Sequence, residues 1–319
     1  MSWEGRRVFV TGATGVIGSA LTRQLLLEGA EVTALIFERP EGSDLIRSKD
    51  IDKVDQIDGR LEDASLLEKT LSKGRFEAVF HLGAQALVES ALVEPVATFE
   101  TNIKGTYNLL DACRTAEGIK AVVVASSDKA YCSKDSLPYT EDMALEGRFP
   151  YEVSKSCTDL LSLAYHRTYA LPVAVTRCGN VYGPGDLNWS RIVPGTIKSL
   201  LAGERPIIRS DGKFKRDYIF VKDIAAAYLR TAEALLAGRC AGEAFNFAAE
   251  SPLSVLEIVI AIQKQMNSSI EPDIRDTAKH EIRDQYLDCV KARETLGWKP
   301  GHSLETGLAE TIAWYKDYL

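Results

Sequence analysis

The sequence predicts an α/β fold, with a doubly wound parallel sheet followed by a smaller C-terminal domain. Two observations carry this prediction. Through residues 1–178, short apolar runs rich in branched residues alternate with segments whose apolar residues have helical spacing, and the connections are short. Strand–helix–strand repetition of this kind implies parallel strands joined by right-handed crossovers. After Asn180 the alternation loosens, because Gly and Pro cluster in GNVYGPGD (179–186).

Five strands are predicted in the first part, because each is a nearly continuous apolar run that suits a sheet covered on both faces. They are RVFVT (7–11), EVTALIF (31–37), FEAVFHL (76–82), AVVVASS (121–127) and PVAVTRC (172–178). The helices between them include one that Asp63 opens as an N-terminal cap and one that stops before Pro172. These helices cover 16–28, 62–73, 95–116 and 151–170. Further helices are expected near 190–202, 222–236, 253–266 and 303–318.

Composition limits the class of function. The 319 residues are 45% hydrophobic and 26% charged, as in an ordinary globular protein. The formal net charge is −7 and no basic stripe is present, so nucleic acid is not an expected partner. No segment has the apolar length of a membrane span, and residues 1–10 lack the features of a signal peptide. The six cysteines and four histidines show no metal-ligand spacing, so we expect reduced thiols, no metal site and a cytoplasmic location.

A glycine-rich loop joins the first predicted strand to the first helix. Residues 11–18 read TGATGVIG. Gly12 permits a tight turn, Gly15 lets backbone amides approach a pyrophosphate at the helix N-terminus, and Gly18 allows the helix to pack closely. Three ordinary turn glycines are the alternative, but the position between a strand and a helix favours a dinucleotide site of Rossmann type. The predicted cofactor contacts in this loop are Gly12, Thr14, Gly15, Val16, Ile17 and Gly18.

The end of the second predicted strand bears on the choice of cofactor. An acidic residue near this point commonly holds the ribose of NAD. Glu38 could fill that role, whereas Arg39 could pair with the extra phosphate of NADP. Both side chains could equally be solvated loop charges, so this feature leaves NAD and NADP open.

A second group of residues suits acid–base chemistry. Tyr151 and Lys155 form YxxxK at the start of a predicted helix, a spacing that puts both side chains on one face. A cation beside a phenol favours the phenolate, which would make Tyr151 a base at neutral pH. Ser127, at the end of the preceding strand, could complete a hydrogen-bonded triad.

With TGATGVIG, Ser127, Tyr151 and Lys155 together, the sequence resembles the extended short-chain dehydrogenase/reductase superfamily, in its branch of NAD-dependent nucleotide-sugar epimerases and dehydratases. Other matching stretches run along the whole chain: HLGAQ (81–85), TFETNIKGT (98–106), RCGNVYGPGD (177–186), RDYIFVKD (216–223) and LGWKP (296–300). One position departs from the family pattern Gly-Asp-x-x-Asp, because Arg60 follows Gly59, and we assign Arg60 no role.

The resemblance implies a domain layout and a set of contacts. A Rossmann domain for NAD(P) would comprise 1–178, rejoined by about 217–240, and residues 179–319 would mainly bind the substrate, a nucleotide-diphosphate sugar. The implied cofactor contacts outside the glycine loop are Leu82, Gly83, Ala84, Tyr151 and Lys155. The implied substrate contacts are Gln85, Asn102, Asn180, Arg191 and Arg216. Family members often form homodimers through helices that correspond here to 95–116 and 151–170.

The stretch SSDKAY (126–131) bears on the reaction. Sugar 4-epimerases usually have non-ionisable residues after the triad serine or threonine, whereas 4,6-dehydratases need two further proton-transfer groups. Asp128 and Lys129 resemble the Asp-Lys pair of the CDP-glucose 4,6-dehydratases within this family. The segments His280–Glu281 and NWSRIVP (188–194) resemble the same group.

This resemblance implies a mechanistic hypothesis. Tyr151 would take the C4 hydroxyl proton as hydride leaves C4 for the nicotinamide. Lys129 would then remove the C5 proton, Asp128 would help water leave C6, and hydride would return to C6. Because the cofactor ends as it began, NAD is favoured over NADP. Two alternatives stay open: a 4-epimerase, in which Asp128 and Lys129 form a structural ion pair, and a non-catalytic module that senses cofactor.

Overall fold

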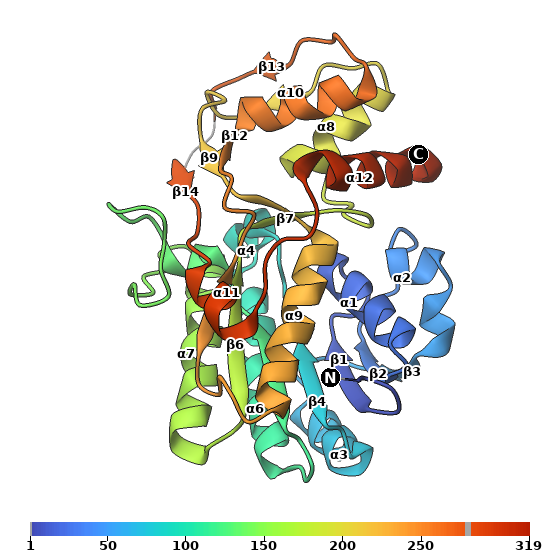
Figure 1. Cartoon of the computed structure of the whole chain (residues 1–319), viewed down its shortest axis with the longest axis vertical. Helices are drawn as coiled ribbons and strands as arrows, with labels where there is room; N and C mark the ends of the chain where they lie inside the picture. The colour runs from blue at the N-terminus through green and yellow to red at the C-terminus, as the bar shows by residue number, and fades with distance from the viewer. Residues whose placement is uncertain (1, 278–281) are drawn as a thin grey trace.

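The computed structural model describes residues 2–277 and 282–319, so the pair His280–Glu281 lies outside the described residues. A sheet of seven parallel strands in the order β11-β6-β5-β4-β1-β2-β3 forms the lower part of the molecule (Figure 1). The predicted α/β fold with a doubly wound parallel sheet is confirmed.

The five predicted strands form the sheet within two residues of the predicted ends. They are β1 (Arg7–Thr11), β2 (Glu31–Ile36), β4 (Ala78–His81), β5 (Ala121–Ala125) and β6 (Val173–Cys178). The sequence pattern does not predict the two edge strands, β3 (Asp55–Asp58) and β11 (Ala244–Phe247). β3 reads DQID, without an apolar run, and β11 has only four residues.

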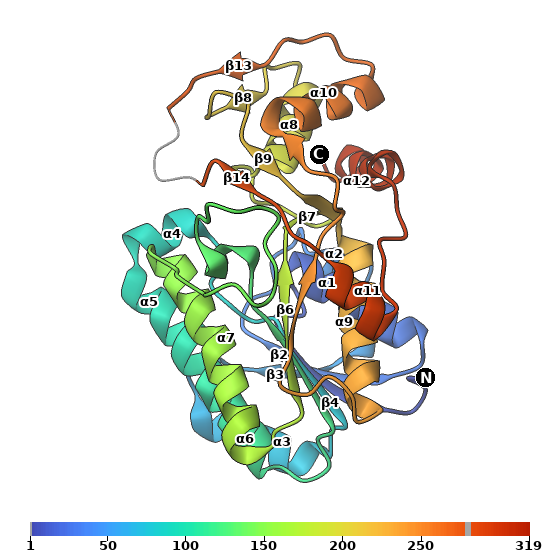
Figure 2. The same ribbon diagram turned by 60° about the vertical axis from the view of Figure 1, so that its left-hand side comes forward.

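Helices cover both faces of the sheet (Figure 2). On one face lie α1 (Val16–Leu27) and α9 (Val221–Leu236), which pack on each other. On the other face lie α3 (Ala64–Gly74), α6 (Gly105–Thr115) and α7 (Pro150–Tyr169). The smaller helices beside the sheet are α2 (Asp44–Arg47), the 3-10 helix η1 (Asp50–Lys53), α4 (Val88–Val93) and α5 (Pro95–Phe99). Asp63 caps α3 as predicted, since its carboxylate accepts from the backbone N–H of Leu66 at 3.0 Å.

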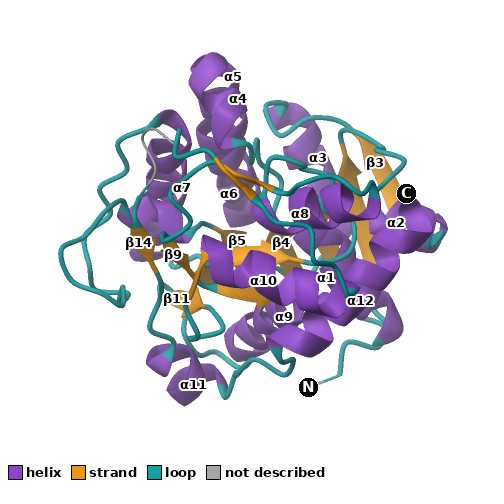
Figure 3. Ribbon diagram, turned by 90° about the horizontal axis from the view of Figure 1, so that it is seen from above, coloured by secondary structure: helices purple, strands orange, loops and turns teal. Residues whose placement is uncertain are grey.

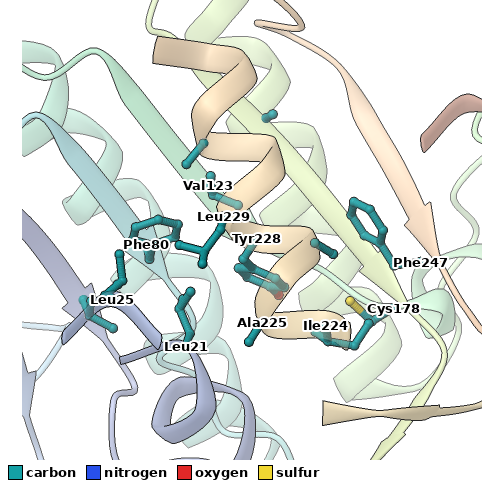
Figure 4. Close-up of a cluster of buried hydrophobic side chains, with 14 of the residues drawn as sticks. Leu21, Leu25, Phe80, Val123, Cys178, Ile224, Ala225, Tyr228, Leu229 and Phe247 are labelled. Carbon is teal, nitrogen blue, oxygen red and sulfur yellow. The ribbon is translucent and has the colours of Figure 1, made fainter. Parts of the chain in front are cut away.

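Helix α9 follows elements of the C-terminal region in the chain, yet it packs on the sheet. The hydrophobic core beneath α9 accounts for this position. Figure 4 shows side chains of α9 meeting those of α1 and of strands β4 and β5. The labelled members include Leu21, Leu25, Phe80, Val123, Tyr228 and Leu229, all of them buried. Burial of each such side chain stabilises the fold by about 1.5–3 kcal/mol. The short helix α11 (Val290–Leu296) packs on α9 and β11 as well.

The helix predicted over 95–116 is interrupted by a π-helical segment, η2 (Glu100–Lys104), between α5 and α6. The carbonyl oxygen of Asn102 accepts hydrogen bonds from the hydroxyls of Thr106, at 2.6 Å, and Thr158, at 3.1 Å. Side-chain donors thus satisfy a carbonyl within the irregular turn, and such turns are frequent near functional sites. Periodicity alone does not reveal them, because the residues on both sides are helical.

The smaller C-terminal region contains three longer helices that pack together: α8 (Ile192–Leu201), α10 (Val255–Met266) and α12 (Leu304–Tyr318). All three lie where the sequence predicts them. Seen from above, they cover the end of the sheet (Figure 3). The short strands of this region are β7 (Asn180–Tyr182), β8 (Ile207–Ile208), β9 (Lys215–Arg216), β10 (Tyr218–Phe220), β12 (Leu253–Ser254), β13 (Asp273–Ile274) and β14 (Asp284–Gln285). Within 2–277 and 282–319, none of the helices has the length and apolar character that a bilayer crossing requires.

Candidate active site

The strand order reverses between β1 and β4, and the loops that follow these two strands are tied together. The backbone N–H of Leu82 donates to the carbonyl of Thr11 at 3.1 Å, and that of Gly83 donates to the Thr11 hydroxyl at 3.0 Å. In open parallel sheets, ligands bind outside the carboxyl ends of the strands at such a switch point. The topology therefore brings the predicted segments 11–18 and 82–84 to one place.

The glycine loop leaves no room for side chains where it approaches the sheet. Gly12 has φ +74°, and a Cβ there would lie 2.7 Å from the backbone nitrogen of Gly83. A Cβ on Gly18 would collide with the carbonyl oxygen of Gly12. Gly15 directly precedes α1, and among the described residues no side chain caps the first turn of this helix. The amides of that turn favour negative charge, so the backbone fits the diphosphate of a dinucleotide.

The two charges predicted to choose the cofactor lie exposed after β2. Arg39 pairs with Asp58, with Nη2 and Oδ1 2.6 Å apart, and it also donates to Gln56. Arg39 would therefore have to leave an acidic partner to hold the phosphate of NADP. Glu38 lies exposed beside it. Nearby, the guanidinium of Arg60 stacks over the Phe37 ring, 4.3 Å from its centroid.

The start of α7 fixes the position of Tyr151. Pro150 is the first helical residue, where its lacking N–H costs nothing. The Glu152 carboxylate accepts from the backbone N–H groups of Arg148, at 2.9 Å, and Phe149, at 3.2 Å. This cap holds the first turn rigidly, so the phenol projects from a defined point next to the end of β5.

The structure brings together the three residues predicted as a triad, which we call the redox group: Ser127, Tyr151 and Lys155. Ser127 hydrogen-bonds the phenol of Tyr151. Lys155 lies one turn further along α7 than Tyr151, and its ammonium donates to the carbonyl of Ala125 at 2.9 Å. Burial lowers the pKa of Lys155 to about 8. The redox group thus unites the end of β5 with the start of α7.

The charges that act on the phenol of Tyr151 are not the ones that the sequence predicts. Burial and, to a lesser extent, the nearby Asp128 carboxylate raise the pKa of its phenol to about 12. The strongest opposing charge is the guanidinium of Arg191, ahead of the bond from Ser127. The sequence analysis predicts that Lys155 lowers the pKa of the phenol. In the structure, the Lys155 ammonium instead donates a hydrogen bond to the backbone carbonyl of Ala125. Arg191 precedes α8 and is held by Asp186, with Nη1 and Oδ2 3.1 Å apart.

Asp128 and Lys129, which we call the elimination pair after the role that the family resemblance predicts for them, start a 3-10 helix, η3 (Asp128–Tyr131), directly after Ser127. The Ser127 hydroxyl donates to Oδ1 of Asp128 at 3.0 Å. The ammonium of Lys129 lies 3.9 Å from Oδ2 of Asp128. Asp128 is 3% exposed, whereas the Lys129 side chain keeps 23% exposure. The serine therefore contacts both the phenol of the redox group and the acid of the elimination pair.

Sequence reasoning missed one residue that contacts both members of the elimination pair. Gln285 of β14 is 1% exposed. Its Oε1 accepts from the Lys129 ammonium, and its Nε2 donates to the Asp128 carbonyl at 2.9 Å. A glutamine in a two-residue strand carries no recognisable signal.

Asn102 and Gln85, predicted as substrate contacts, hold each other. The Asn102 Oδ1 accepts from the Gln85 backbone N–H at 2.8 Å, and its Nδ2 donates to the Gln85 carbonyl at 3.0 Å. Nδ2 also donates to the Ser154 hydroxyl at 2.9 Å. These bonds fix the loop after β4 against α7. A direct contact of either residue with substrate stays a prediction.

The two remaining predicted substrate contacts lie in the short strands above the sheet. Asn180 begins β7, and its N–H donates to the carbonyl of Asp217 at 2.9 Å. Arg216 is 7% exposed, and its guanidinium donates to the carbonyls of Lys215 and Arg283, both at 2.8 Å. It also donates to the carbonyl of Ile282. Their predicted contact with a diphosphate therefore stays a prediction, and Arg216 would have to exchange backbone partners to make it.

The Rossmann-type fold and the redox group are together typical of dinucleotide-dependent enzymes of the short-chain dehydrogenase/reductase type. More narrowly, the chain belongs to the NAD dependent epimerase/dehydratase family, whose model matches residues 8–248. This match confirms the family that the motifs predict. It also confirms the prediction that NAD is the cofactor.

Three relatives illustrate the range of the family. The chain is 30% identical to the CDP-glucose 4,6-dehydratase of Salmonella typhimurium, over 99% of this chain and 92% of the relative. It is 31% identical to the UDP-glucose 4-epimerase of Mycolicibacterium smegmatis, over 98% of this chain and 99% of the relative. A crystal structure of the dTDP-glucose 4,6-dehydratase of Streptomyces venezuelae with NAD bound superposes with a TM-score of 0.86 at 31% identity. That match covers 98% of this chain and 97% of the other.

Proposed function

We propose that the protein is a nucleotide-sugar 4,6-dehydratase that converts a nucleotide-diphosphate hexose into a 4-keto-6-deoxy sugar with the loss of water. The observation that carries this proposal is the elimination pair beside the redox group. The Asp128 carboxylate lies beside the phenol, the Lys129 amine lies 3.9 Å from that carboxylate, and the hydroxyl of Ser127 contacts both the phenol and the acid. Dehydration needs these extra groups, whereas epimerisation does not.

Each residue then has a defined task. Bound NAD would supply a reversible hydride acceptor, so that hydride leaves C4 of the sugar and later returns to C6. Because burial keeps the phenol of Tyr151 protonated, it accepts the proton of the C4 hydroxyl as its own proton passes to Ser127. Once C4 is a ketone, Lys129 removes the proton from C5, and Asp128 protonates the C6 hydroxyl that leaves as water. Lys129 gives its proton back to C5 as C6 is reduced.

The contacts of Ser127 balance the protons in this scheme. Tyr151 gains one proton from the C4 hydroxyl, and Asp128 loses one to the departing water. Ser127 hydrogen-bonds the phenol and donates to Oδ1 of Asp128 at 3.0 Å. A proton relayed from Tyr151 through the serine hydroxyl to Asp128 restores both groups, so each cycle ends with the starting protonation.

We further propose CDP-glucose as the substrate, on the strength of the Asp128–Lys129 pair and of the Salmonella relative. The sheet with α9 would hold NAD, and residues 179–319 would mainly hold the sugar nucleotide. Arg191 lies close enough to act on the phenol of Tyr151, which supports a substrate site between the two parts.

A product assay tests the proposal. The purified protein with added NAD is incubated with CDP-glucose, GDP-mannose, UDP-glucose and dTDP-glucose, and the products are followed by mass spectrometry. Loss of one water from CDP-glucose is the expected result. Dehydration of a different sugar nucleotide would replace the CDP assignment and keep the reaction. An unchanged mass with an inverted C4, seen by NMR, would overturn the dehydratase proposal.

A 4-epimerase is the second candidate, favoured by the relative from Mycolicibacterium smegmatis and by the ion pair within the elimination pair. In that case Asp128 and Lys129 would be structural, and the redox group would do all the chemistry. A cofactor-sensing module without catalysis is the third. A Tyr151→Phe protein that retained its biological effect would support that role.

We also propose a homodimer formed through α5, α6 and α7. These helices carry exposed apolar side chains, among them Val96, 73% exposed, Leu160, 57% exposed, and Tyr107, 40% exposed. A shallow apolar hollow beside them is lined by Ile103, Cys157, Leu160, Leu161 and Ala164. Sedimentation should give the mass of two chains, and Leu160→Glu should give that of one. A wild-type monomer would refute the dimer. The cytoplasmic location stays a prediction.

A further inference from the structure

Gln285 joins the elimination pair to the C-terminal region through one buried amide. The amide uses both of its ends: Oε1 accepts from the ammonium of Lys129, and Nε2 donates to the backbone carbonyl of Asp128 at 2.9 Å. A buried amide that is satisfied in this way has one orientation, because rotating it would place donor against donor. Gln285 therefore fixes the Lys129 amine relative to the backbone that carries Asp128.

The strand that carries Gln285 is itself fixed to the predicted substrate-binding strand. β14 pairs in parallel with β9, and in this register Gln285 lies opposite Arg216. The backbone N–H of Lys215 donates to the Asp284 carboxylate at 3.0 Å, which adds a side-chain bond to the pairing. β9 also pairs with β12, so β14 forms one edge of a three-stranded sheet. The position of Gln285 is thus set by the C-terminal region.

We propose that Gln285 is a positioning residue for elimination: it holds the Lys129 amine so that its lone pair meets the C5 proton of the sugar. This proposal rests on the proposed dehydratase function. A neutral amine that donates one N–H to Oε1 of Gln285 directs its lone pair away from that oxygen. In the reaction the amine gains the C5 proton, the electrons of the C5–H bond form the C5–C6 double bond, and the C6–O bond breaks as water leaves.

Gln285→Met tests the proposal, because methionine keeps the length of the side chain and removes both hydrogen bonds. A small displacement of a reacting group costs up to about 100-fold in rate. We therefore expect kcat to fall about 10–100-fold while KM for the sugar nucleotide changes less than about twofold. Oxidation at C4 needs only the redox group, so reduced nicotinamide should accumulate on the enzyme and be seen by its absorbance.

Gln285→Glu gives a second readout that a purely structural role would not produce. The carboxylate keeps an acceptor for Lys129 but favours the charged ammonium. We expect the activity of this variant to recover as the pH rises, with its pH profile displaced upward from that of the wild type. The matched control is Asp284→Asn on the same strand: its amide oxygen can still accept from the Lys215 N–H and keep β14 paired with β9, so kcat should stay within about twofold. NAD affinity and Tm show that each variant is folded.

Wild-type kcat in Gln285→Met would overturn the positioning role. So would a slow variant without accumulated reduced nicotinamide, since both halves of the reaction would then be impaired alike. These failures differ from failure of the proposed function. A wild-type protein that epimerises without losing water would overturn the dehydratase proposal and the role of Gln285 with it.

Discussion

The redox group and the elimination pair meet at the consecutive residues Ser127 and Asp128, yet the molecule holds them in different ways. Ser127, Tyr151 and Lys155 are positioned by the end of β5 and the capped start of α7, two elements of the sheet domain. The amine of Lys129 is held by Gln285, which follows it by 156 residues and belongs to the C-terminal region. On our proposal, hydride transfer would depend on local structure, and elimination would depend on how the C-terminal region meets the sheet.

Tyr151→Phe should have the largest effect, because it stops the first step, on which both groups depend. Loss of a general base costs about 10²–10⁴-fold in rate, and we expect a loss of about 10³-fold or more. Stopped-flow absorbance should show no reduced nicotinamide. Tyr169→Phe, at the exposed end of the same helix, is the control and should keep its activity. Rapid formation of reduced nicotinamide in Tyr151→Phe would show that another group removes the C4 proton.

Asp128→Asn and Lys129→Met should separate the two groups. We expect about a 10²-fold loss of dehydration in each, with oxidation at C4 retained, so that reduced nicotinamide accumulates during turnover. Rapid-quench analysis would detect the 4-keto sugar that still carries its C6 hydroxyl. Asp135→Asn, an exposed neighbour, is the matched control. Dehydration at the wild-type rate in Asp128→Asn would reduce the elimination pair to a structural ion pair.

Gly12→Ala should weaken the cofactor site and spare the elimination pair. The new Cβ would press on the backbone of Gly83 at 2.7 Å, and the positive φ is strained for alanine. We expect NAD affinity, measured by calorimetry, to fall about tenfold, which corresponds to about 1.4 kcal/mol. Gly5→Ala controls for strain alone, since Gly5 also has positive φ, at +69°, and open space around its Cβ position. Equal losses of affinity in both variants would argue against a cradle for NAD.

The pH dependence of stability should report the burial of Lys155. Its folded pKa of about 8 lies below the ordinary value of 10.5, so the unfolded chain binds more protons in between. The free energy of unfolding of the wild type, relative to Lys155→Met, should therefore rise as the pH increases from about 8 to about 10.5. The slope is at most about 1.4 kcal/mol per pH unit. Urea denaturation at several pH values measures it, and a difference independent of pH would mean that Lys155 stays charged when buried.

Most of the fold could be predicted because its strands are apolar runs and its helices have regular spacing. β3 could not, because its residues are polar and partly exposed at the sheet edge. The two-residue strands β8, β9, β12, β13 and β14 are too short to leave a pattern, since partners distant in sequence create them.

The candidate site divides in the same way. The redox group could be predicted because Tyr151 and Lys155 are one helix turn apart and Ser127 follows an apolar strand, and both features are local in the sequence. The charge of Arg191 near Tyr151 and the amide of Gln285 on Lys129 were missed. Both act across the fold, and no local spacing encodes them. Asn102 was predicted from family motifs, but its bonds to the loop after β4 depend on the π-helical segment, which interrupts an otherwise helical pattern.

The separation of 156 residues between Lys129 and Gln285 along the chain has a consequence for biosynthesis. A ribosome releases the glycine loop, Tyr151 and Lys155 well before it adds Gln285. Even when β11 and α9 have completed the sheet, the nascent chain lacks the residue that holds Lys129. On our proposal, a nascent chain at this stage cannot complete dehydration, because Gln285 is not yet there to orient the Lys129 amine. Full turnover therefore awaits the synthesis of β14, long after that of the redox group.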